Sequence, residues 1–115
     1  MRGIAAALLA GVLGGCATSE PSLYSWGAYE DLIYSSYREP GKLPAEAQVE
    51  RLEQDRQVAL AKSRRLPPGW HAHLGILYYQ LGKLDQAVQE LTTEKAEFPE
   101  AAVFVDRLLS NLKKS

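Results

Sequence analysis

Two histidines are the first residues of this sequence to weigh for chemistry, because imidazole nitrogens bind metals and move protons near neutral pH. His71 and His73 are the only histidines of the chain, and both fall in a segment with helical spacing. Two histidines that share a metal on one helix usually stand four residues apart. A separation of two turns their side chains about 200° apart around a helix. The spacing therefore predicts no metal site and favours histidines that are buried, hydrogen-bonded or at an interface.

The carboxylates offer a second kind of chemistry, because a pair of acidic groups can act as general acid and base when one pKa is shifted. The glutamates in question lie on polar helical segments and are Glu50, Glu53, Glu90, Glu94 and Glu97. We expect them to be solvated and to pair with basic residues one helical turn away. The sequence also contains no nucleophile-elbow motif and no glycine-rich phosphate loop. We therefore predict that the chain is not an enzyme and has no catalytic residues, metal or cofactor.

The single cysteine indicates a covalent modification of the chain. Cys16 follows Leu13-Gly14-Gly15, at the end of an apolar stretch from Ile4 to Leu13 that has Arg2 before it. A basic start, a short apolar segment and small residues are the pattern of a secretory signal. The stretch is too short for an uncleaved anchor, since spanning a bilayer takes about 20 apolar residues. A buried thiol is the other interpretation of Cys16, but the tether-like composition of residues 17–21 disfavours it.

This segment resembles a bacterial lipoprotein signal, in which a peptidase cuts before the cysteine and the cysteine then carries the lipid. By that resemblance, residues 1–15 are a signal peptide, and the mature protein is attached to the membrane by a lipid (palmitate) on Cys16. Residues 16–23 form the lipid-anchored linker, which reaches roughly 25 Å when fully extended. Ala17 is not aspartate, and by resemblance to lipoprotein sorting this favours the periplasmic face of an outer membrane.

Composition limits the size and the partners of the remaining chain. Removing a 15-residue signal from 115 residues leaves 100, enough for one domain, and no second cysteine is present to form a disulfide. Loss of Arg2 leaves 12 basic and 14 acidic residues. The basic runs Arg64-Arg65 and Lys113-Lys114 stand at expected helix C-termini, where positive charge is favourable. We predict no nucleic-acid binding, which needs a clustered basic surface, and identify no small-molecule substrate.

Helical spacing of apolar residues continues through the rest of the chain, without a strand pattern of useful length. We expect one helix from Tyr24 to Tyr37, with Ser25 as its N-cap, and a largely solvated helix from Pro44 to Arg65. Further helices are expected over residues 70–80, 84–98 and 100–113, separated by proline and glycine. The sequence thus predicts an all-α fold of about five helices in antiparallel hairpins, forming a single domain over residues 24–115.

Four of the expected helices have an apolar face that we predict to be buried. On the first helix this face is Trp26, Tyr29, Ile33 and Tyr37. On the second it is Val49, Leu52, Ala59 and Leu66. On the helix over 84–98 it is Leu84, Ala87, Val88, Leu91 and Lys95. On the last helix it is Ala101, Phe104, Val105, Leu108 and Leu112.

Residues 68–101 have the length and spacing of a helical hairpin. The positions that carry the pattern are Leu74-Gly75, Tyr78, Gly82, Ala87, Leu91 and Pro99. They resemble a tetratricopeptide repeat, although Trp70 stands one position before the usual aromatic and Glu94 replaces a small residue. One such repeat cannot bury its faces alone. We therefore expect the helix over 100–113 to cap it and the first half of the chain to cover its other side.

Three further motifs cover nearly all of the chain after the signal. They are Tyr24-Ser25-Trp26-Gly27 with Tyr29-Glu30, Pro67-Pro68-Gly69 with His71-Ala72-His73-Leu74-Gly75, and Glu94-Lys95 with Phe98-Pro99-Glu100, Phe104 and Asp106-Arg107-Leu108-Leu109. With these motifs the chain resembles a family of small bacterial outer-membrane lipoproteins without an assigned activity. The resemblance implies a gene beside those of a curli-secretion-type lipoprotein and another small lipoprotein, hence a joint envelope assembly. No catalytic residues come with it.

Five of the ten aromatic residues lie within residues 24–37. Tryptophan and tyrosine are frequent at binding hot spots and at membrane interfaces, while core packing is the simpler interpretation for Trp26, Tyr29 and Tyr37. The candidate partner-binding residues are Tyr24, Tyr34, Trp70 and Tyr79. We expect a non-catalytic adaptor or assembly factor of the cell envelope that binds a partner protein. The alternatives are a regulator of peptidoglycan synthesis or remodelling, and a purely structural envelope lipoprotein.

Overall fold

The computed structural model describes residues 23–114, so the expected signal, Cys16 and most of the expected linker lie outside the described residues. The helices are α1 (Tyr29–Arg38), α2 (Ala45–Ala61), α3 (Trp70–Gln80), α4 (Leu84–Glu97), the 3-10 turn η1 (Pro99–Ala101) and α5 (Ala102–Lys113). Residues 23–114 contain no strand, only an isolated bridge between Tyr24 and Arg65. The predicted all-α fold of about five helices is confirmed.

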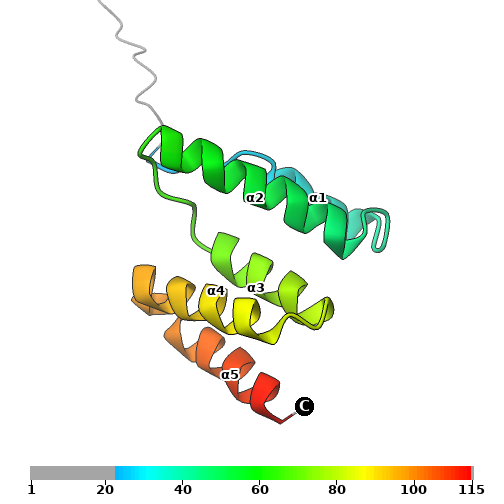
Figure 1. The fold of residues 1–115 in the computed structure, drawn as a ribbon, viewed down its shortest axis with the longest axis vertical. Helices are drawn as coiled ribbons and strands as arrows, with labels where there is room; N and C mark the ends of the chain where they lie inside the picture. Colours follow the sequence, from blue (N-terminus) through cyan, green and yellow to red (C-terminus); the bar gives the residue numbers. More distant parts are fainter. Residues whose placement is uncertain (1–22, 115) are drawn as a thin grey trace, which may run out of the picture.

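Successive helices run in opposite directions, and α2 to α5 stack side by side in chain order, as Figure 1 shows. The hairpin of α3 and α4 is the most tightly packed pair, with α2 against α3 and α5 against α4. We call the end at which α3 begins and α4 ends the proximal end (residues 23–27, 62–69 and 98–101). The opposite end, with residues 39–44, 81–83 and 113–114, is the distal end. The described chain therefore begins at the proximal end.

Two glycines allow the close contacts of α3. Gly69 precedes the helix with a φ of +91°, and a Cβ there would lie 2.5 Å from the Tyr29 hydroxyl oxygen. In the middle of α3, a Cβ at Gly75 would lie 3.0 Å from the Leu91 Cγ and 3.2 Å from the Ala87 carbonyl oxygen. A larger side chain at Gly75 would therefore push α3 away from α4, in agreement with the close helix approach expected from the sequence.

The start of the chain differs from the prediction. The helix begins at Tyr29 because residues before it run beside residue 65, where the Ser25 N–H donates to the Arg65 carbonyl oxygen at 2.8 Å. Ser25 is therefore not an N-cap. On α1, Leu32 is the buried residue, whereas Tyr37 is 84% exposed and Trp26 also reaches the surface. The predicted burial of Trp26 and Tyr37 is wrong.

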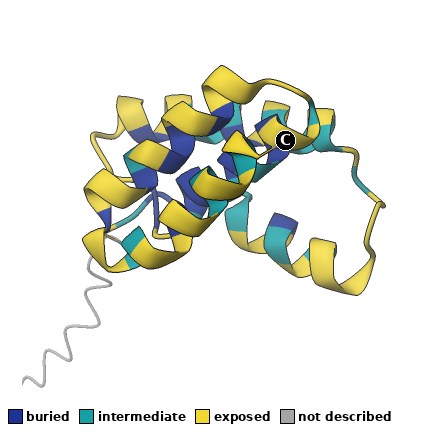
Figure 2. Cartoon of the chain, turned by 90° about the horizontal axis from the view of Figure 1, so that it is seen from below, coloured by how far each residue is buried: buried dark blue, intermediate teal, exposed yellow. Residues whose placement is uncertain are grey.

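The second helix has the predicted core face, because Leu52, Ala59 and the following Leu66 are buried. It ends at Ala61 rather than Arg65, since the chain leaves the helix through Ser63, which has a φ of +51°. The α1 surface is mostly exposed, whereas buried residues gather where α2, α3 and α4 face one another (Figure 2). Within residues 23–114, no helix has the length and apolar character needed to cross a bilayer.

The third and fourth helices have nearly the predicted bounds, but the buried face of α4 differs. Ala87 and Leu91 are buried as expected. Leu84, Val88 and Lys95 are exposed, contrary to the prediction. The two other inward side chains of α4 are the carboxylates Glu90 and Glu94, which the prediction left in solvent. On α5, Val105 is buried, while Phe104 is exposed and its predicted burial is wrong.

Candidate functional site

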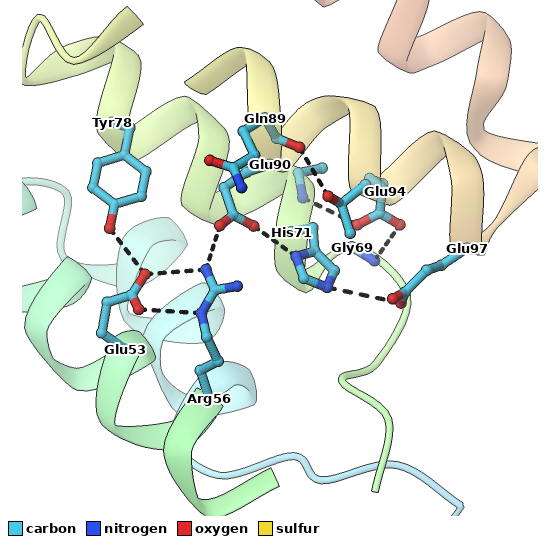
Figure 3. A network of polar contacts seen from close by, with 11 residues as sticks. Glu53, Arg56, Gly69, His71, Tyr78, Gln89, Glu90, Glu94 and Glu97 are labelled. Carbon is cyan, nitrogen blue, oxygen red and sulfur yellow. Dashed lines mark hydrogen bonds and ion pairs between the residues drawn. The ribbon is translucent and has the colours of Figure 1, made fainter. Parts of the chain in front are cut away.

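A network of charged and polar side chains connects α2, α3 and α4 (Figure 3). We call it the polar network, and its side chains are Glu53, Arg56, His71, Tyr78, Glu90, Glu94 and Glu97. They approach from three helices, so the network exists only in the folded chain. Its residues include the most deeply buried charge among the described residues, that of Glu94.

Glu94 caps a helix to which it does not belong. Its side chain is 1% exposed, and its two carboxylate oxygens accept hydrogen bonds from the N–H groups of Gly69 and Ala72, both at 3.0 Å. These groups lie at the start of α3, which has no side-chain cap of its own. A carboxylate at a helix N-terminus also interacts favourably with the helix dipole. Glu94 therefore supplies from α4 the acceptors that α3 lacks.

Arg56 lies between two glutamates and the face of an indole ring. It donates two hydrogen bonds to Glu53 at 3.1 Å and one to Glu90, while its guanidinium carbon lies 5.1 Å from the Trp70 ring centroid. Burial alone would lower the pKa of Arg56, but the hydrogen bonds and charges of Glu90 and Glu53 outweigh it and raise the pKa. The guanidinium is thus kept charged in contact with all three residues.

Glu90 receives hydrogen bonds from two cationic or polar partners. His71 donates from Nδ1 to one carboxylate oxygen at 2.6 Å, and Arg56 donates to the other. Burial by itself would raise the pKa of Glu90, but these hydrogen bonds outweigh burial and hold that pKa below its ordinary value. The second ring nitrogen of His71 lies 3.7 Å from a Glu97 oxygen. Both ring nitrogens of His71 therefore face carboxylates.

The predictions for these carboxylates and histidines have different outcomes. The expectation that Glu90 and Glu94 are solvated is wrong, whereas Glu53 does pair with Arg56 one turn away. His71 is buried and hydrogen-bonded, as one of the expected interpretations stated. His73 contacts a different helix, with Nε2 at 3.2 Å from the Gln48 Oε1, and burial lowers its pKa.

The histidines contact different groups, as their spacing implied. Among residues 23–114, no three or more histidine, cysteine or acidic side chains are grouped so that they could hold a metal ion. Of the buried side-chain nitrogens and oxygens in residues 23–114, the Trp70 Nε1 lacks a hydrogen-bond partner. Its ring nonetheless packs edge-on against His71 at a centroid distance of 5.0 Å. The network as a whole joins α2, α3 and α4 through side-chain contacts.

Tyr78 gives the network a measurable response to alkaline pH. Its hydroxyl donates to a Glu53 oxygen at 2.9 Å, and burial, followed by that contact, raises the pKa of Tyr78 to about 12. Because the folded pKa lies above the unfolded value of 10, the stabilising contribution is complete below pH 10 and is lost as pH rises toward 12. Urea unfolding at several pH values should show a steeper loss of stability above pH 10 in the natural protein than in Tyr78→Phe. Parallel curves would contradict the assignment.

The candidate partner-binding residues lie in different surroundings. Trp70 is fully buried beneath Arg56, so its predicted role as a contact residue is wrong. Tyr24 is half-buried and packs against Trp26 and Phe98, with centroid distances of 6.2 and 6.1 Å. Tyr34 is exposed on α1, where its hydroxyl accepts a hydrogen bond from Arg38 at 2.7 Å. Tyr79 is partly exposed on α3.

An apolar groove between α3 and α5 brings Tyr79 together with residues that the sequence did not single out for binding. Its lining is Gly75, Ile76, Tyr79, Leu91, Leu108, Asn111 and Leu112. A second groove lies on the other side of Ile76 and is lined by Ser36, Pro40, Gly41, Leu43, Gln48, His73, Ile76, Leu77 and Gln80. We call the two together the α3 groove. Its helical lining comes mainly from α3 and α5, while α1, α2 and α4 each contribute one residue.

Comparison with known proteins places the chain in a family. Searches of curated proteins and of solved structures gave no match. The model of one protein family matches residues 23–108, which run from the first described residue into α5 and include the whole polar network. This match covers most of the chain. The chain therefore belongs to the family described as Domain of unknown function (DUF4810).

Proposed function

We propose that this protein is a non-catalytic adaptor of the bacterial envelope, anchored by a lipid on Cys16, which binds a segment of a partner protein in the α3 groove. The observation that carries the proposal is the groove itself, where Ile76, Tyr79 and Leu108 offer apolar surface beside the polar side chains of Asn111 and His73. Concave, mostly apolar surfaces with a few polar groups are the usual form of binding sites.

The arrangement of helices supports a tetratricopeptide-like interpretation of the fold. Helices α3 and α4 form a hairpin in which Gly75 allows close contact, and α5 packs on α4 as the next helix would in a repeat array. Stacked helical repeats bind partners on extended concave surfaces. Most of the helical lining of the α3 groove comes from α3 and α5, which are alternate helices of the stack, as in such a surface. A curli-secretion-type lipoprotein is the partner that the family resemblance suggests.

The lipid anchor has a direct test. Cys16→Ser removes the thiol that would accept the lipid, so the precursor should remain uncleaved and mature-size protein should largely disappear from the membrane fraction. Immunoblotting of fractionated cells measures both effects. Ala17→Ser changes the neighbouring residue and keeps the thiol, which makes it the control. Normal processing and membrane retention of the Cys16→Ser protein would contradict the proposal.

The groove is tested by site-specific photocrosslinking in living cells. A photoreactive residue at Ile76 or Tyr79 should form a crosslink to one defined envelope protein, because both side chains line the groove. Val88 on α4 is exposed to a similar extent as Tyr79 and serves as the matched control. A crosslink of equal strength from Val88, or none from Ile76 and Tyr79, would contradict the adaptor function. A cell-wall synthase as the captured protein would instead support the peptidoglycan regulator.

A further inference from the structure

The proximal end carries exposed apolar and basic side chains side by side. Leu23 is 69% and Leu60 is 66% exposed, and Lys62, Arg64 and Arg65 are exposed as well. We call these five residues the proximal patch. Isolated exposed leucines are common on protein surfaces. A surface on which two exposed leucines lie next to three basic residues has the composition expected at a membrane interface.

Contacts within the proximal end hold the patch together. The bridge between Tyr24 and Arg65, with its 2.8 Å hydrogen bond from the Ser25 N–H, fixes Leu23 next to the chain at residues 64–66. Leu60, Arg64 and Arg65 line one pocket, whose lining also includes Ala59 and Leu66. The leucines and arginines therefore belong to one surface, although they come from two separate segments.

The charges of the patch are available to an anionic ligand. Arg65 donates to the Glu97 carbonyl oxygen at 3.3 Å and lies over the Phe98 ring, so its position is fixed. Glu97 is the one carboxylate that lines this pocket, and one of its oxygens lies 3.7 Å from the His71 Nε2. Within residues 23–114, neither Lys62 nor Arg64 forms an ion pair. The patch thus has an excess of positive charge with an apolar floor.

We propose that the proximal patch lies on the bilayer surface, with Leu23 and Leu60 in the interface and Lys62 and Arg64 on the phosphates of anionic lipids. This inference rests on the proposed lipid on Cys16, because the six residues between Cys16 and Leu23 hold residue 23 within roughly 25 Å of the anchor. Lipid chains and basic residues act together in membrane attachment. In this orientation α3, which runs from the proximal to the distal end (Figure 1), points away from the membrane. The residues that line the α3 groove follow it toward the distal end.

The test uses the mature lipidated protein, purified from membranes and placed in vesicles of phosphatidylglycerol and phosphatidylethanolamine. Leu60→Cys introduces a thiol that an environment-sensitive dye can label. The dye labels residue 60 alone, because the sulfur of the lipid-modified Cys16 does not react with it. Leu84→Cys, at the start of α4 near the distal end and exposed to a comparable extent, is the matched control. We expect a blue-shifted emission and quenching by nitroxide-labelled lipid at residue 60, and a water-like emission at residue 84. The same emission at both residues would overturn the proposal.

Charge reversal tests the role of the basic side chains. In Lys62→Glu/Arg64→Glu the blue shift at residue 60 should be lost, while Lys83→Glu/Lys113→Glu changes the net charge equally at the distal end and should retain it. In phosphatidylcholine vesicles the natural patch should show a smaller shift. A blue shift that survives the proximal reversal would overturn the lipid-phosphate contacts. Mass spectrometry of Cys16 separates failure of the patch from failure of the anchor, because a missing lipid contradicts the proposed function itself.

Discussion

Replacing Glu94 with alanine should lower the free energy of unfolding by about 3–5 kcal/mol, because two buried N–H groups lose their acceptor at about 1–3 kcal/mol each and a cavity remains. The groups are those of Gly69 and Ala72 at the start of α3. Domains of this size are stable by only about 5–15 kcal/mol. The variant should therefore be partly unfolded at moderate temperature, as urea unfolding followed by circular dichroism would measure.

A conservative replacement separates the effect of the lost hydrogen bonds from the effect of the cavity. Glu94→Gln keeps the volume but offers one acceptor oxygen where two are used, so it should lose roughly half as much stability, about 1.5–3 kcal/mol. Glu50→Gln makes the same chemical change at an exposed position of α2 and should stay within about 0.5 kcal/mol of the natural protein. Equal stabilities of the Glu94→Gln and Glu50→Gln proteins would show that α3 does not depend on this cap.

Local sequence signals predicted the hairpin of α3 and α4 and missed the start of the chain. Proline and glycine mark both ends of that hairpin, so its helices were predicted to within about one residue. The start of α1 depends on a contact 27 residues away, where the Asp55 carboxylate accepts a hydrogen bond from the Ala28 N–H at 2.8 Å. Such a contact leaves no mark in the local pattern. Ser25 looked like a cap, but its backbone N–H bonds to Arg65 instead.

The buried carboxylates were missed because burial was judged from apolar spacing alone. Glu90 and Glu94 share the inward face of α4 with Ala87 and Leu91. Apolar spacing assigns a glutamate to the solvent-facing side even when it stands among such residues. A usable signal did exist, since Gly69 cannot cap α3 with a side chain, and any buried N–H groups at the start of α3 then need acceptors from elsewhere in the chain. The partner-binding role predicted for Trp70 failed for a related reason, because Trp70 is buried and Arg56 from α2 covers its ring.

The contact of Arg56 with Glu90 should show strong energetic coupling in a double-mutant cycle. Arg56→Met leaves Glu90 buried with only His71 as a partner and should destabilise the fold by about 2–4 kcal/mol, somewhat less than for a fully buried pair because Arg56 is a quarter exposed. Glu90→Met should cost a similar amount. In the double variant both charges are removed together, so neither is left buried without its partner. Its loss of stability should therefore be smaller than the summed losses of the two single variants by at least about 1.5 kcal/mol.

The exposed pair of Lys95 and Asp106 provides the matched cycle. Its charged atoms lie 2.7 Å apart and connect α4 to α5, but both side chains are about half exposed. We expect a coupling of about 0.2–1 kcal/mol for Lys95→Met and Asp106→Asn. Both pairs connect neighbouring helices by direct contact, so a larger coupling for Arg56 and Glu90 would measure the effect of burial. Couplings of the same size would mean that the apolar core around Leu52 and Leu74 holds α2 in place without help from the polar network.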